Sequence, residues 1–74
     1  MNNFPRREIV ERLKTQYVRG DRVRLRSMED RQATPIGTLG TVIGVDDIGS
    51  VMVNWDNGST LSLVYGEDYC TRLV

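Results

Sequence analysis

The 74-residue sequence contains no histidine and one cysteine, Cys70. These two shortages exclude an internal disulfide, a zinc site of the usual His/Cys type and a histidine-based catalytic triad. The chain also lacks any apolar run near the roughly 20 residues of a membrane-spanning helix, and Met1–Pro5 does not have the pattern of a signal peptide. We therefore expect a soluble protein of a reducing compartment that uses no metal and no other cofactor.

Net charge is absent because two oppositely charged halves of the chain cancel. Residues 1–31 carry nine basic and five acidic side chains, a net charge of +4. Residues 32–74 carry one basic and five acidic side chains, a net charge of −4. This asymmetry marks either a partner-binding surface or two halves that attract each other across the fold.

The first segment with a helical period covers residues 4–17. Ile9, Leu13 and Tyr17 recur at a spacing of four and form one apolar stripe, and Gly20 ends the segment. A helix of this length is marginal in isolation, so the stripe must pack against the rest of the protein. We expect Ile9 and Leu13 to make that contact.

After Gly20 the apolar residues recur every second position, which is typical of strands with one buried face. Strands are predicted near residues 22–26, 39–45, 51–55, 61–63 and 71–74, joined by a nine-residue loop at 28–36 and by tight turns. The predicted core consists of the apolar residues that carry this period: Val23, Leu25, Leu39, Val42, Ile43, Val45, Val51, Val53, Leu61, Leu63 and Leu73.

One helix followed by five short strands predicts a mainly β fold, a small SH3-like, five-stranded, partly open barrel with one N-terminal α-helix. The helix would occupy residues 1–19 and pack on a barrel of residues 20–74. Closure suits so short a chain because it protects strand edges that a flat sheet would expose.

Glycine and other turn-forming residues lie within and between the predicted strands. Gly40, Gly49 and Gly58 are best explained by turns, bulges or close backbone approach. Asp56 and Asn57 precede Gly58 between two alternating runs, and Asn-Gly in that position predicts a hairpin. We expect a type I′ turn with positive φ at both Asn57 and Gly58.

A long motif covers the middle of the chain: Gly37-Thr38-Leu39-Gly40-Thr41-Val42-Ile43-Gly44-Val45-Asp46-Asp47-Ile48-Gly49, then Val51-x-Val53-Asn54-Trp55-Asp56-Asn57-Gly58-Ser59-x-Leu61. Together with Gly20–Val23 and the N-terminal helix, it resembles a short uncharacterised family found largely in bacteriophages and prophages of Gram-positive bacteria. The resemblance implies a phage or prophage gene acting in the cytoplasm of a bacterial host. It implies no particular activity.

A more distant resemblance is to the Mib/Herc2 domain, an SH3-like barrel of eukaryotic ubiquitin ligases that serves protein recognition. The matching positions are Gly20, Arg22, Val23, Gly37, Gly40, Thr41, Val42, Gly49, Val51, Val53, Trp55, Asp56, Asn57 and Gly58. The aromatic and acidic loop of that domain is replaced here by Met28–Pro35. The resemblance therefore implies the fold and a binding role without a peptide specificity.

Arg22, Arg24 and Arg26 alternate with apolar residues and should project from one face of the first strand. A guanidinium binds carboxylates and phosphates bidentately, so this face suits an acidic protein or an anion. Two alternatives remain open. The face is simply solvated, or its arginines pair with the acidic half through Asp46, Asp47 or Glu67.

Trp55 shares the parity of Val51 and Val53, which places it in the core or at the rim of the barrel. At the rim it would bind a partner beside Asn54 and Tyr65, next to the long loop. The candidate partner-binding residues are therefore Arg22, Arg24, Arg26, Met28, Arg31, Asn54, Trp55 and Tyr65.

These residues favour a non-catalytic binding module that acts on a protein partner, such as host machinery or a defence component. A nucleotide or nucleic-acid binder using the arginine face is the second hypothesis, and a structural virion or assembly component is the third. No catalytic residue is predicted, because the paired acids are sequence neighbours in turns and Cys70 has no histidine to activate it. No metal site is predicted either, since Asp46-Asp47 lacks the spaced ligands of a calcium loop.

Overall fold

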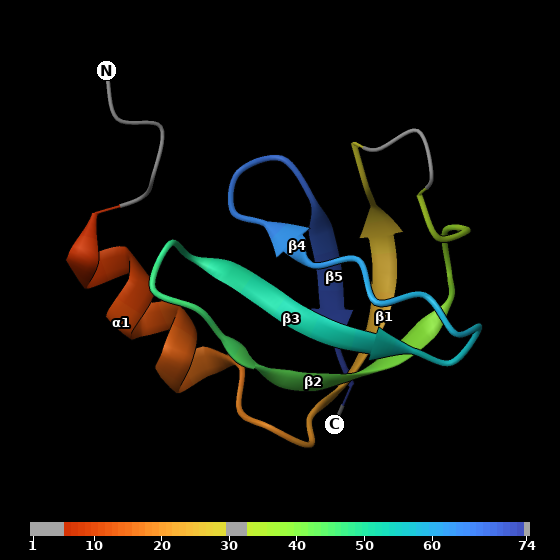
Figure 1. Ribbon diagram of the computed structural model, residues 1–74, viewed down its shortest axis with the longest axis horizontal. Coiled ribbons are helices and arrows are strands. Elements are labelled where there is room, and N and C mark those ends of the chain that lie inside the picture. Colours follow the sequence, from red (N-terminus) through yellow and green to blue (C-terminus); the bar gives the residue numbers. More distant parts are fainter. Residues whose placement is uncertain (1–5, 30–32, 74) are drawn as a thin grey trace.

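The computed structural model describes residues 6–29 and 33–73 (Figure 1). One helix precedes five strands, which are α1 (Arg7–Gln16), β1 (Arg22–Ser27), β2 (Leu39–Val45), β3 (Ser50–Trp55), β4 (Leu63–Val64) and β5 (Tyr69–Arg72). The mainly β class with one N-terminal helix is confirmed. Within the described ranges no helix is long and apolar enough to cross a membrane.

The five strands form one antiparallel sheet in the order β4-β3-β2-β1-β5. Figure 1 shows β2 and β3 crossing β1 and β5 at a steep angle, so the sheet bends strongly. It remains open, however, because β4 and β5 are its two edges and no ladder joins them in the described part of the chain. Where the sequence predicted a partly open barrel, the structure therefore has an open, bent sheet that does not close.

The core lies on the inner face of this bend. Seven buried side chains from four of the strands form it: Val23, Leu25, Val42, Val51, Val53, Trp55 and Leu63. Their alternation follows the period of two read from the sequence. Burying a Val or Leu side chain is worth about 1.5–3 kcal/mol, so this cluster supplies much of the stability of a chain this short.

Five residues of the predicted core are only half-buried: Leu39, Ile43, Val45, Leu61 and Leu73. Leu39 lies opposite Arg24 in the β1–β2 ladder and therefore belongs to the outer face. A register shift between Val42 and Gly44 displaces Ile43 from the alternation and returns Val45 to the side of the core. A strict period of two could not anticipate that shift.

Helix α1 docks through Val10 and Leu13, whereas Ile9 is only half-buried. Leu13 is buried as the prediction required, and Val10 rather than Ile9 is the second fully buried residue of the helix. The buried residues Val10 and Leu13 are three positions apart, a spacing that places them on one face of a helix.

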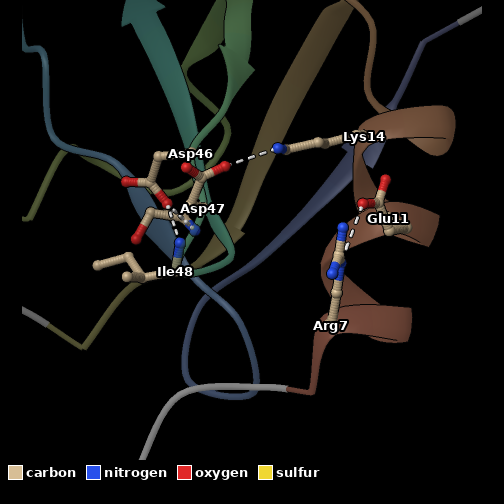
Figure 2. A network of polar contacts seen from close by, with 7 residues as sticks. Arg7, Glu11, Lys14, Asp46, Asp47 and Ile48 are labelled. Carbon is tan, nitrogen blue, oxygen red and sulfur yellow. Dashed lines mark hydrogen bonds and ion pairs between the residues drawn. The ribbon is translucent and has the colours of Figure 1, made fainter.

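An ion pair ties α1 to the turn between β2 and β3 (Figure 2). Lys14 Nζ lies 2.8 Å from Asp47 Oδ1, which raises the pKa of Lys14 and lowers the pKa of Asp47 mainly through this hydrogen bond. In the same turn the Asp46 carboxylate accepts the backbone N–H of Ile48 at 3.1 Å. The pair is exposed, so it orients the helix more than it stabilises it.

The hairpin after β3 is real, but its predicted turn type is wrong. A type I′ turn needs a positive φ at both Asn57 and Gly58. Gly58 has φ +93°, but no described residue other than glycine has a positive φ, so Asn57 does not meet this requirement. Gly58 N–H donates to Trp55 O at 2.9 Å and Trp55 N–H to Ser59 O at 2.9 Å. This pattern is a three-residue connection with the glycine at its left-handed position, and the Asn57 side chain accepts the Ser59 N–H.

The substitution Gly58→Val tests this turn. A Cβ at Gly58 would meet no heavy atom within 4 Å, so the cost comes from the backbone conformation alone. We expect Gly58→Val to lower the free energy of unfolding by about 1–2 kcal/mol, and Gly58→Asn to lower it by less, because asparagine tolerates this region. Urea unfolding of both variants measures the difference, and equal stabilities would contradict the assigned conformation.

Candidate functional site

The outer face of the sheet carries the arginines predicted to bind a partner. Arg22 already binds acceptors of the protein itself. Its Nη1 donates to Asp56 Oδ1 and to Thr41 Oγ1, both at 2.9 Å, and its Nη2 donates to Asp56 Oδ2 at 2.6 Å. The hydrogen bonds raise the pKa of Arg22 and lower the pKa of Asp56. The pairing hypothesis had named Asp46, Asp47 or Glu67 as partners. The partner of Arg22 is instead Asp56, which the hairpin turn brings beside β1.

The other predicted residues of this face remain accessible. Arg24 and Asn54 are exposed, and Arg26 Nη1 donates to Thr71 Oγ1 at 3.1 Å. Met28 is half-buried against the core rather than presented to solvent. Arg31 lies outside the described residues.

Trp55 does not form a rim. Its side chain is 3% exposed, and its indole N–H donates to Leu61 O at 2.8 Å. Both the ring and its donor are therefore used inside the protein, which corrects the prediction that Trp55 contacts a partner. The parity that it shares with Val51 and Val53 places it in the core.

Part of the charge asymmetry of the sequence is neutralised within the fold. In the described residues, the ion pairs Lys14–Asp47 and Arg22–Asp56 each join a cation of residues 1–31 to an acid of residues 32–74, whereas Arg72–Asp21 joins the one cation of the acidic half to an acid of the basic half. Among the two interpretations of that asymmetry, these contacts favour attraction between the halves.

A cleft of about 310 Å³ opens between α1 and the β4–β5 segment. Its lining residues are Leu13, Gln16, Tyr17, Val51, Leu63, Val64, Tyr65, Gly66, Asp68, Tyr69 and Cys70. They include all three tyrosines of the chain and its one cysteine. We call this feature the tyrosine cleft, and it occupies the place where the two edges of the sheet fail to meet.

The turn between β4 and β5 holds the outer wall of the tyrosine cleft in position. Gly66 has φ +84°, and its carbonyl accepts the Tyr69 hydroxyl at 3.1 Å. The Asp68 carboxylate accepts the backbone N–H of Val64 at 2.8 Å and of Glu29 at 2.7 Å. Tyr65 and Tyr69 are 50% and 57% exposed, so both side chains are open to solvent.

Sequence reasoning found only Tyr65 among the three tyrosines. Tyr17 lies four residues after Leu13, so the apolar stripe placed it on the docking side of α1 but did not say what it faces. Tyr65 and Tyr69 are four residues apart, at the two ends of a turn that contains Gly66. No pattern in the sequence brings this turn next to the helix, because that proximity arises only from the bent sheet.

The inner wall of the tyrosine cleft pairs Tyr17 with Cys70. Cys70 Sγ lies 3.8 Å from the Tyr17 hydroxyl oxygen, to which it donates. Burial, helped by the neighbouring thiol, raises the pKa of Tyr17 from 10.0 to about 12, and burial also raises the pKa of Cys70. Both groups are therefore held in their neutral forms, so this wall is apolar and uncharged at neutral pH.

Alkaline pH should weaken the fold through Tyr17. Its folded pKa lies above its unfolded value, so the stabilising effect is complete below pH 10 and is lost as the pH rises toward 12. We expect the urea midpoint of the wild type to fall more steeply between pH 10 and pH 12 than that of Tyr17→Phe. Parallel slopes for the two proteins would show that Tyr17 ionises as freely in the folded state as in the unfolded state.

The tyrosine cleft has a mixed, mostly apolar lining. Its lining combines aromatic rings, aliphatic side chains, one amide and one carboxylate. Across residues 6–29 and 33–73 no group of three or more His, Cys, Asp or Glu side chains is placed to hold a metal ion. A mostly apolar, partly aromatic cleft with a few polar groups is typical of ligand-binding sites.

Comparison with known proteins identifies the family. No curated protein and no solved structure matches the chain significantly. A family model matches residues 6–73, which include all the elements described above. The chain therefore belongs to the family described as "Domain of unknown function (DUF4314)".

Proposed function

We propose that this protein is a non-catalytic binding module that recognises a linear segment of a protein partner in the tyrosine cleft. The observation that carries the proposal is the gathering of Tyr17, from the end of α1, with Tyr65 and Tyr69, from the β4–β5 segment, around one opening. Two of these rings are at least half exposed, although large apolar side chains usually pack inside a domain.

The dimensions of the tyrosine cleft suit a short segment. A volume of about 310 Å³ is at the lower end of the range for ligand sites, so it accommodates one or two side chains rather than a large cofactor. Tyrosine gives a rigid, amphipathic contact at little cost in conformational entropy. Grooves lined by aromatic rings are a recurrent way of holding extended peptides.

The cellular setting is part of this proposal. The resemblance of the Gly37–Leu61 motif to phage and prophage proteins supports a phage-encoded protein that acts in the cytoplasm of a bacterial host. Host machinery or a defence component is then the class of partner. The resemblance to the Mib/Herc2 domain supports protein recognition over other binding functions.

The arginine face supports the alternative, a phosphate-binding protein, less well. Arg22 is engaged by Asp56, and Arg26 donates to Thr71. Phosphate binding by this face would depend on Arg24 and would weaken steeply with salt. The third hypothesis, a virion or assembly component, requires a symmetric oligomer, which sizing in solution detects.

The proposal is tested by selecting binders from a display library of random dodecapeptides on the immobilised protein. We expect the selected peptides to bind Tyr65→Ala at least about tenfold more weakly than the wild type, because aromatic anchors dominate such contacts. Tyr65 is half exposed, and no hydrogen bond of its side chain is found in the described structure, so Tyr65→Ala should remain folded.

Arg24→Ala is the matched control, since Arg24 is exposed on the outer face of the sheet. It should leave the affinity unchanged. Selection of no peptide, or equal affinities for wild type and Tyr65→Ala, would overturn the proposal. Binding that depends on Arg24 and falls steeply with salt, measured also with single-stranded oligonucleotides, would favour the phosphate-binding alternative.

A further inference from the structure

The tyrosine cleft is negatively charged at its outer wall. Asp68 contributes a carboxylate to the lining, and the exposed Glu67 lies between the lining residues Gly66 and Asp68. Among the described residues, no Lys or Arg lines the cleft, and none of the four ion pairs found there includes Glu67 or Asp68. By contrast, Asp47 and Asp56 of the same acidic half are each paired with a cation.

The position of Asp68 is fixed before any ligand arrives. Two backbone N–H groups, from Val64 and Glu29, hold its oxygens, one on each. Each carboxylate oxygen has a further lone pair, so Asp68 can accept another donor without breaking these contacts. A preorganised acceptor loses little entropy on binding, which favours a charged donor on the ligand.

In the sequence, Tyr65 precedes Asp68 by three residues and Tyr69 follows it directly. Both tyrosine side chains are exposed and line the same cleft. The face of an aromatic ring attracts a cation, and a guanidinium also stacks on it. The aliphatic stem of an arginine would lie against Leu63 and Val64, which line the same cleft. A long side chain with a cationic end therefore complements the tyrosine cleft in shape and in charge.

From this complementarity we infer that the partner segment inserts an arginine side chain into the tyrosine cleft, where its guanidinium meets Asp68 and Glu67 between the rings of Tyr65 and Tyr69. This inference rests on the proposed function and names its ligand class, a basic linear segment. An acidic or phosphorylated segment would face the same carboxylates unfavourably and is excluded from this site.

The first test uses two small probes that isolate the charge of the ligand. Butylguanidinium chloride and sodium butanoate are each titrated into the protein while the ring resonances of the three tyrosines are followed by NMR. We expect the Tyr65 and Tyr69 signals to shift with butylguanidinium and to stay unchanged with butanoate. Equal shifts with both probes, or shifts with butanoate alone, would overturn the inference.

Charge reversal at the rim provides the matched variants. Glu67→Lys should reduce the affinity for butylguanidinium at least about tenfold, because a like charge then faces the probe. Glu8→Lys changes the net charge by the same amount on the exposed first turn of α1, outside the lining of the cleft, and should leave the affinity unchanged. Circular dichroism verifies that both variants are folded. An equal loss of affinity for butylguanidinium in both variants would show that only the net charge of the protein matters, and it would overturn the inference.

The selected dodecapeptides separate this inference from the proposed function. If they bind through Tyr65 and share an arginine whose replacement by glutamine weakens binding at least about tenfold, both ideas are supported. If they bind through Tyr65 without any basic residue, the proposed function stands and the arginine inference is wrong. If no peptide binds, the proposed function is wrong whatever the small probes do.

Discussion

Replacing Trp55 with alanine should unfold a large fraction of the protein at moderate temperature. Trp55 is 3% exposed at the centre of the core cluster, and truncation of such a side chain costs about 3–5 kcal/mol. A domain of this length has a total stability of about 4–11 kcal/mol, so the loss is a large share of it. Each kcal/mol lowers the melting temperature by about 4–8 °C, and circular dichroism follows the change.

Trp55→Phe separates the two roles of this side chain. Phenylalanine keeps most of the buried ring but removes the N–H that donates to Leu61 O. The loss of that donor, together with the smaller ring, should cost about 1–3 kcal/mol. Tyr65→Ala is the control, because it truncates an aromatic ring that is half exposed. A Trp55→Ala protein as stable as Tyr65→Ala would contradict the placement of Trp55 in the core.

Gly40→Ala should destabilise the protein through a direct clash with the core. A Cβ at this position would lie 2.6 Å from Val53 Cγ1 and 2.7 Å from Trp55 Cε3, and 3.1 Å from the backbone oxygen of Asn54. Both side chains belong to the packed core, so neither can move away freely. We expect a loss of about 1–3 kcal/mol and a changed emission of Trp55, the chain's one tryptophan, in the folded state.

Gly44→Ala, four residues along the same strand, is the matched control. Its Cβ would meet Met52 Cε at 3.6 Å, an ordinary van der Waals contact at the end of a flexible side chain. Alanine also restricts the unfolded chain, so this variant should be as stable as the wild type or more stable by about 0.4–1 kcal/mol. The melting temperature of Gly40→Ala should therefore fall, while that of Gly44→Ala stays unchanged or rises. A shift of the same size and sign in both variants would refute the close approach at Gly40.

The alternation of apolar residues predicted much of the fold. Val23, Leu25, Val51 and Val53 point into the core as their parity requires, because one face of each strand is buried. Parity fails at Ile43, where an irregular register displaces one residue of β2. Such a shift depends on how two strands meet, which the local sequence does not encode.

The candidate site was harder to predict than the fold. The arginines of β1 were predicted to bind a partner because they alternate along one short strand. Arg22 instead donates two hydrogen bonds to Asp56, which lies 34 residues away in the sequence. Tyr17 and Tyr69 come from opposite ends of the chain and meet only once α1 has docked. A site made by long-range packing leaves no local pattern from which it can be read.

The edges of the sheet also bear on how the protein behaves at high concentration. β4 has only two residues, which offers a neighbouring molecule too short a backbone to extend into a shared sheet. β5 has four, and beside it Arg72 donates to the carbonyl of Gln16, so the end of the helix stands against that strand. Short or covered edges oppose the edge-to-edge strand addition that leads to fibres. The open sheet of this protein therefore exposes little backbone on which a second copy could build a shared sheet.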